Sequence, residues 1–187
     1  MTGTHTTSSD PTVDRESLPV ELVDEQGRAT GVLPVADAHM APGRLHRAFS
    51  VLLFAPDGRV LLQQRAAVKT RFPLRWSNTC CGHPAPGQSV TEAALARLGE
   101  ELRVRAELRE VGVYRYRAAD PATGRVEDEW DHVLIGDFDG LPDDADPAEV
   151  AATRWLDPDH LDADIAAAPE DFTPWLHGVL TTARAAR

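Results

Sequence analysis

The sequence predicts an α+β protein of one domain, with a mixed β-sheet, packed helices and a hairpin near its N-terminal end. Short apolar runs separated by turn residues indicate paired strands. A capping box followed by apolar residues at four-residue spacing indicates a helix between them. The 187 residues suffice for one domain with a sizeable core, and a second domain is not required.

The composition restricts the partners of the protein. The formal net charge is -11 at pH 7 and the sequence pI is near 5.0, which speaks against nucleic acid or an anionic membrane as the main partner. A local basic patch can still bind phosphate groups. No apolar run is long enough to span a membrane, and the polar start Met1–Asp10 has no apolar signal core. We expect a cytoplasmic protein, and a monomer.

The N-terminal part is expected to change from a tail to a domain near residue 18. Residues 1–17 are rich in Thr, Ser, Asp and Glu and carry almost no large apolar groups, so we expect a disordered tail and a domain over 18–187. Apolar runs within Pro19–Leu33 flank Asp24–Gly27, which predicts a hairpin. Val35–His46 has neither strand nor helix period and is interpreted as a loop that places His39 and His46.

Two strands and a basic loop follow. Ala48–Phe54 and Val60–Arg65 are apolar runs on either side of Asp57–Gly58, and Asp-Gly is the strongest short hairpin signal. The second strand delivers Arg65 to its end. The loop over residues 66–75 is basic in an otherwise acidic chain and could meet an anionic group. Its cations are Lys69, Arg71 and Arg75.

The best-defined helix begins after Ser89. Ser89 and Glu92 have the spacing of a capping box, and the helix should run to about Arg103. One core stripe consists of Val90, Ala94, Leu98 and Leu102. Arg97 and Glu101 are four residues apart and share a stripe beside it. There they can meet a ligand or simply be solvated.

The second half of the chain adds three strands and two helices. Strands are expected at Glu107–Ala118, Val126–Phe138 and Glu149–Leu156, and helices at 158–168 and 174–185. In the second of these strands Glu127, Glu129 and Asp131 alternate onto one face. Like charges at this spacing repel one another unless a bound cation or solvent screens them. This row is therefore either an exposed strand face or part of a metal site.

The rest of the chain is organised around the stretch Trp76–Pro84. Cys81 and His83 are two residues apart and point the same way in an extended segment. Cys80 then faces the opposite side, so no disulfide with Cys81 is expected and both thiols should be reduced. A cysteine can act as nucleophile, acid, redox group or metal ligand, but a Cys-x-His match is also common in packed cores.

One group of residues is suited to a single metal ion. Imidazoles and carboxylates together can hold a divalent transition metal of the Mn, Fe or Zn type in five or six coordination. A structural zinc site would prefer thiolates at Cys-x-x-Cys spacing, which this sequence lacks. The candidate ligands are His39, His46, His83, Glu127 and Glu129.

Four segments carry a family resemblance: Leu45–Phe49, Trp76–Pro84, Arg115–Ala118 and Val126–Glu129. In order and approximate spacing they resemble type I isopentenyl-diphosphate isomerase, a member of the Nudix superfamily. The resemblance covers about residues 22–183, and its Cys-Gly-His-Pro and Glu-x-Glu runs are not general Nudix features. It implies a Nudix-like mixed sheet sandwiched between helices. It also implies a 1,3-allylic rearrangement that interconverts isopentenyl diphosphate and dimethylallyl diphosphate in isoprenoid biosynthesis.

The same resemblance implies a set of catalytic residues and two kinds of metal ion. The five candidate ligands would hold one Mn²⁺ or Zn²⁺. Glu101 would help to hold a Mg²⁺ that arrives with the diphosphate. Cys81 and Glu129 would be the two acid–base groups, with Tyr116 assisting Glu129.

Further residues would bind the substrate, a small-molecule diphosphate. Arg65, Lys69 and Arg97 would anchor its anionic end, although surface charge is the alternative for the last two. Trp175 would offer a π face to a carbocation, or be a core aromatic. Arg71 and Arg75 are interpreted as surface charges.

The alternative functions are a Nudix hydrolase and a metal-dependent binding module. The hydrolase signature expects Glu at Gln88, an Arg-Glu pair at Ala96–Arg97 and Gly at Arg103, whereas Glu100 and Glu101 fit it. The cluster of carboxylates that binds the metal ions of a Nudix hydrolase is therefore incomplete in this sequence, which argues against hydrolysis.

Overall fold

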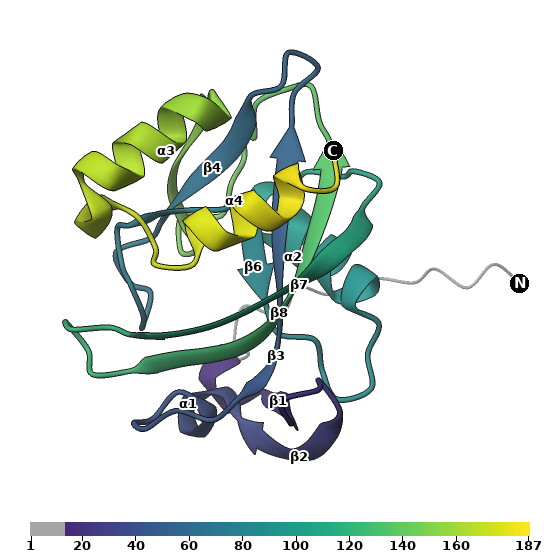
Figure 1. The fold of residues 1–187 in the computed structure, drawn as a ribbon, viewed down its shortest axis with the longest axis vertical. Coiled ribbons are helices and arrows are strands. Elements are labelled where there is room, and N and C mark those ends of the chain that lie inside the picture. The colour runs from purple at the N-terminus through teal and green to yellow at the C-terminus, as the bar shows by residue number, and fades with distance from the viewer. Residues whose placement is uncertain (1–13) are drawn as a thin grey trace, which may run out of the picture.

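The computed structural model describes residues 14–187 and shows a mixed β-sheet with helices on both faces (Figure 1). In chain order the strands are β1 (Pro19–Val23), β2 (Ala29–Pro34), β3 (His46–Phe54), β4 (Val60–Arg65), β5 (Trp76–Ser77), β6 (Cys80–Gly82), β7 (Arg109–Ala119), β8 (Val126–Asp137) and β9 (Val150–Leu156). The helices are α1 (Val35–Ala38), α2 (Val90–Leu102), α3 (Pro158–Ala167) and α4 (Leu176–Arg184), with short 3₁₀ turns at Arg15–Ser17 and Pro169–Asp171.

The sheet is built around β3. Within the described range all the strands join into one nine-stranded sheet. β3 pairs antiparallel with β1, β4 and β6, and parallel with β8 over its whole length. No helix in residues 14–187 has the length and apolar character needed to cross a bilayer.

Residues of β3 face two different cores because side-chain direction alternates along a strand. Leu52 and Phe54 pack into a core that includes Leu161 of α3 and Leu176 of α4. Leu53 lies in a second core with the apolar stripe of α2. The helices α3 and α4 therefore cover one face and α2 the other (Figure 1). The predicted α+β fold with a sandwiched sheet is confirmed.

Helix α2 follows its sequence signals closely. The Ser89 side chain accepts from the backbone N–H of Glu92, and the whole predicted stripe is buried. The residue after the helix, Arg103, has φ 56. This is the left-handed C-cap conformation that favours glycine, at the position where the Nudix signature has Gly.

The loop expected at Val35–His46 is partly wrong. Val35–Ala38 forms one helical turn, and His46 is the first residue of β3. Val35 and Ala38 are buried against Val20 and Leu22 of the N-terminal hairpin. Tertiary packing therefore stabilises a turn that is too short to show a sequence period.

The boundary of the expected tail also needs correction. Residues 1–13 of that tail lie outside the described residues. Asp14 caps the turn at Arg15–Ser17 by accepting from the Glu16 N–H at 3.0 Å. Arg15 and Glu16 form ion pairs with the domain. These residues are held by ion pairs and not by apolar burial, so a segment poor in apolar residues is still ordered here.

Candidate active site

A cavity of about 440 Å³ lies where β4, β6, β8 and the N-terminal turn meet. Strand direction explains why residues far apart in sequence reach it: β6 and β8 flank β3 on its two sides. Most of the site residues predicted from the sequence reach this cavity. They are Arg65, Lys69, Cys81, His83, Arg97, Tyr116, Glu127, Glu129 and Trp175.

Beside the cavity, the five candidate metal ligands come together. His39 follows α1, His46 begins β3, His83 follows β6, and Glu127 and Glu129 share a face of β8. One ligand atom from each of the five lies within 4.8 Å of the others. The parallel ladder sets His46 directly opposite Glu129, so sheet register brings imidazole and carboxylate together.

The hydrogen bonds of these ligands fit a divalent cation. Nδ1 of His39 and Nδ1 of His46 each donate to a backbone carbonyl at 2.7 Å, which points the lone pair of each Nε2 toward the cluster. There, Nε2 of His39 lies 2.7 Å from Glu127 Oε2, and Nε2 of His46 lies 3.2 Å from His83 Nε2. Such acceptors repel one another unless a proton or a cation lies between them.

The charge states also suit metal ligation. Burial lowers the pKa of His83 to about 4, so its imidazole is neutral at pH 7. Burial alone would raise the pKa of Glu129, but hydrogen bonds from His46 and His83 hold it well below its usual range. Neutral imidazole and ionised carboxylate are the forms that bind metals. Burial and the charge of Glu129 raise the pKa of Asp131, whose Oδ2 accepts from Ser50 at 2.7 Å.

The two cysteines face opposite sides of β6. Cys80 is fully buried in the core with α2, whereas Cys81 faces the cavity. Both are free thiols. Burial raises the pKa of Cys81 to about 12, although Arg65, whose Nη1 lies 3.8 Å from the Cys81 sulfur, opposes the effect. The Cys81 thiol is therefore protonated at neutral pH.

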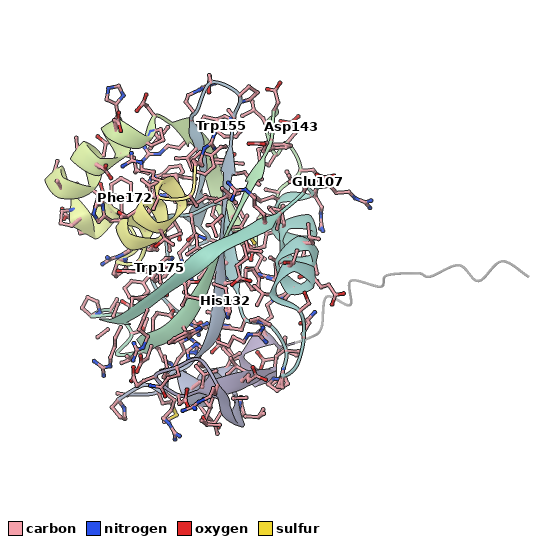
Figure 2. All side chains as sticks on the ribbon, turned by 45° about the vertical axis from the view of Figure 1, so that its right-hand side comes forward. Glu107, His132, Asp143, Trp155, Phe172 and Trp175 are labelled. Atoms are coloured by element: carbon pink, nitrogen blue, oxygen red, sulfur yellow. The ribbon has the colours of Figure 1, made fainter. Side chains whose placement is uncertain are left out.

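Two aromatic residues lie over the carboxylate end of the cavity. Tyr116 Oη donates to Glu129 Oε2 at 2.7 Å, and the Trp175 ring stacks on Tyr116 with centroids 5.6 Å apart. Figure 2 shows Trp175 at the start of α4, beside the sheet. Its Nε1 donates to Asn78 Oδ1 at 3.0 Å, a residue that the sequence did not single out. Trp175 is 3% exposed and lines the cavity, so it is both a core aromatic and a cavity wall.

The opposite end of the cavity is built from ion pairs around Glu149. Lys69 pairs with this carboxylate, and Arg97 Nη2 lies 3.3 Å from its Oε1. Burial opposes ionisation, but Lys69 and Arg97 lower the pKa of Glu149 to about 2. Sequence reasoning missed Glu149 because it is one acid in an acidic stretch. Glu101 is buried between Arg97 and Gln63 and lies outside the five-ligand cluster.

The interpretation of Arg71 as a surface charge is wrong. Its side chain is 11% exposed. Arg71 Nε donates to Glu127 Oε1 at 3.1 Å, and Nη1 donates to Glu16 Oε1 at 2.8 Å. The neighbouring Phe72 is buried in the core, and its N–H donates to Asp120. This anchor turns the basic loop inward at Arg71.

Comparison with known proteins identifies the family. Residues 44–176 match the model of the NUDIX domain. Over 169 residues the chain is 69% identical to the isopentenyl-diphosphate Delta-isomerase of Nocardia farcinica, an alignment that covers 90% of this chain and 96% of that protein. The chain belongs to the isopentenyl-diphosphate Delta-isomerase family. Another relative in this family, from Streptomyces griseus, is 45% identical over 186 residues, which cover 99% of this chain and 91% of that protein.

Solved structures agree with the fold. A protein from Deinococcus radiodurans superposes with a TM-score of 0.71 at 23% identity, covering 90% of this chain and 99% of that one. A Nudix hydrolase from Nitrosomonas europaea gives 0.55 at 18% identity, covering 74% and 88%. At these identities the likeness concerns the fold alone. The family and the fold expected from the sequence are confirmed.

Proposed function

We propose that Cys81 and Glu129 are the acid–base pair for the reaction that the chain catalyses as a member of its family, the isomerisation of isopentenyl diphosphate to dimethylallyl diphosphate. Moving the double bond requires a proton to be added at the terminal carbon and another to be removed from C2. An unactivated alkene is a very weak base, so both groups must be held close to it. The observation that carries the proposal is that one cavity contains a thiol from β6 and a carboxylate from β8.

The hydrogen bonds around the pair support these roles. Tyr116 donates to Glu129 Oε2, so it can orient the carboxylate and assist proton transfer. The positive charge that develops on the substrate needs shelter from water, and the Trp175 face, which lines the cavity, can supply a π surface. Arg65 lies with its guanidinium carbon 5.7 Å from the centre of that ring.

We assign the five-ligand cluster to one Mn²⁺ or Zn²⁺. Its donor set and its facing lone pairs fit such an ion. When bound, the ion supplies positive charge that tunes the acidity of Glu129. His39 and His46 are held for ligation by their backbone hydrogen bonds, and Arg71 holds Glu127 from the other side.

The anionic end of the substrate is assigned to Arg65, Lys69 and Arg97. The last two already pair with a carboxylate, Glu149, in the same cavity, and this supports a place for an anionic group at this end. Glu101, beside Arg97, is assigned to a Mg²⁺ that comes with the diphosphate. A cytoplasmic location, a monomeric state and the lack of a nucleic-acid partner remain predictions.

The test is proton NMR of isopentenyl diphosphate incubated with the protein and Mg²⁺ in deuterated water. We expect dimethylallyl diphosphate that carries deuterium, and no such product from a Cys81→Ala protein. Release of phosphate from a nucleoside diphosphate derivative, with no allylic product, would favour the Nudix hydrolase instead. The residues Gln88 and Arg103, which depart from the hydrolase signature, speak against that outcome.

A further inference from the structure

The N-terminal turn Arg15–Ser17 forms part of the wall of the catalytic cavity. Arg15 and Glu16 line the same space as Cys81. Glu16 accepts from Arg71 Nη1 at 2.8 Å and 3.0 Å and from Thr70 Oγ1 at 2.9 Å. Because Arg71 also donates to the metal-site carboxylate Glu127, the turn is tied to that side of the cavity through a buried guanidinium.

Arg15 extends from this turn to the anion-binding side. Its Nη2 lies 2.7 Å from Glu100 Oε2, and its Nε lies 3.2 Å from Glu149 Oε1. Glu149 also pairs with Lys69 and Arg97. Cations from the N-terminal turn, the basic loop and α2 therefore converge on one carboxylate. Such convergence marks a place where negative charge is stabilised.

The balance of charge around this end of the cavity gives Arg15 a role there. Around this end, Lys69 and Arg97 face the carboxylates of Glu149, Glu101 and Glu100. Without Arg15, these three carboxylates outnumber the two cations, and only Arg65 of the same cavity makes up the difference. With Arg15 the charges balance, so Arg65 and a bound Mg²⁺ provide a surplus of positive charge for the diphosphate.

The side chain of Arg15 is placed to change partners. It is 44% exposed, as is its partner Glu100, so releasing that surface ion pair costs little. A guanidinium can donate two parallel hydrogen bonds to phosphate oxygens. We propose that Arg15 is a further substrate-binding residue, which contacts the diphosphate while Glu16 and Arg71 hold the turn over the cavity. This inference rests on the diphosphate site of the proposed function.

The experiment compares the full-length protein with Arg15→Gln, Arg15→Lys and the control Arg59→Gln. Arg59 lies in the β3–β4 turn, where it pairs with Asp57 at 2.8 Å. The measurements are kcat and KM for isopentenyl diphosphate, and the Kd of inorganic pyrophosphate with Mg²⁺ by calorimetry. Loss of a charge-assisted contact should raise KM and Kd about tenfold in Arg15→Gln. We expect a smaller rise in Arg15→Lys, no change in the control, and kcat within about twofold of wild type.

Two results would overturn the inference. The first is wild-type KM and Kd in Arg15→Gln. The second is a loss confined to kcat or Tm with unchanged Kd, which would give Arg15 a purely structural role. Failure of the proposed function looks different: the wild-type protein would then make no dimethylallyl diphosphate, while calorimetry would still report whether Arg15 binds the anion.

Discussion

Replacing each of the adjacent cysteines with alanine should impair two different properties of the protein. Cys80 is 0% exposed and packs among the apolar residues of the α2 core. Removing its sulfur leaves a small cavity, for which we expect a loss of about 1 kcal/mol in the free energy of unfolding. In a domain of this size that lowers Tm by about 2–4 °C. The isomerase activity should stay close to wild type because the Cys80 side chain does not face the substrate cavity.

Cys81→Ala should show the reverse pattern. The thiol faces the cavity, so its removal opens no void in the core and should change the free energy of unfolding by less than about 0.5 kcal/mol. Loss of an acid–base group should lower kcat by at least about 10³-fold. Thermal unfolding followed by circular dichroism and turnover followed by NMR measure both quantities. Equal losses of turnover in the two variants would refute the assigned facing of β6.

Three further predictions concern the carboxylates, the thiol and the end of α2. Glu129→Gln should lose turnover that added metal cannot restore, whereas Glu127→Gln should recover at least partly with Mn²⁺ or Zn²⁺; near-normal turnover of Glu129→Gln at saturating metal would move the proton-transfer role to another group. Because burial raises the pKa of Cys81 to about 12, the thiolate fraction grows as pH rises. Alkylation of this residue by iodoacetamide in a Cys80→Ala protein should accelerate about tenfold per unit between pH 8 and pH 10, and a plateau near pH 9 would contradict it. Arg103→Gly should stabilise the protein by about 0.5–1 kcal/mol in urea unfolding, because φ is 56 at that position, and a loss of stability would contradict that reasoning.

Elements with a clear period could be predicted from the sequence, and those held by tertiary contacts could not. The stripe of α2 and the strands β3 and β4 follow directly from residue spacing. By contrast, α1 is a single turn that forms because Val35 and Ala38 are buried against the first hairpin. The turn at Arg15–Ser17 depends on ion pairs to residues more than fifty positions away. Neither leaves a local signal.

The candidate site divides in the same way. Period two along a strand relates Cys81 to His83 and Glu127 to Glu129, so their common facing was predictable before the structure. Glu149 and Arg71 were not found because each is ordinary in its own segment. Their importance comes from neighbours: Lys69 and Arg97 around the first, Glu16 and Glu127 around the second. The sequence around a charged residue does not indicate whether its side chain is buried or exposed.

The candidate metal ligands depend on the register of the parallel pair β3 and β8. A one-residue change of that register would remove the ligands even where the backbone could still form its hydrogen bonds. A shift of β8 by one residue relative to β3 could keep the ladder of hydrogen bonds, since every residue offers the same donor and acceptor. It would nevertheless turn Glu127 and Glu129 away from His46 and present Asp128 and Trp130 in their place. A single-residue insertion between Glu129 and the buried Val133 would therefore turn both glutamates away from the cluster while the core part of β8 kept its register. An ion held by His46 and Glu129 would bind only the correctly aligned sheet. Its binding free energy would therefore stabilise that sheet over the misaligned one.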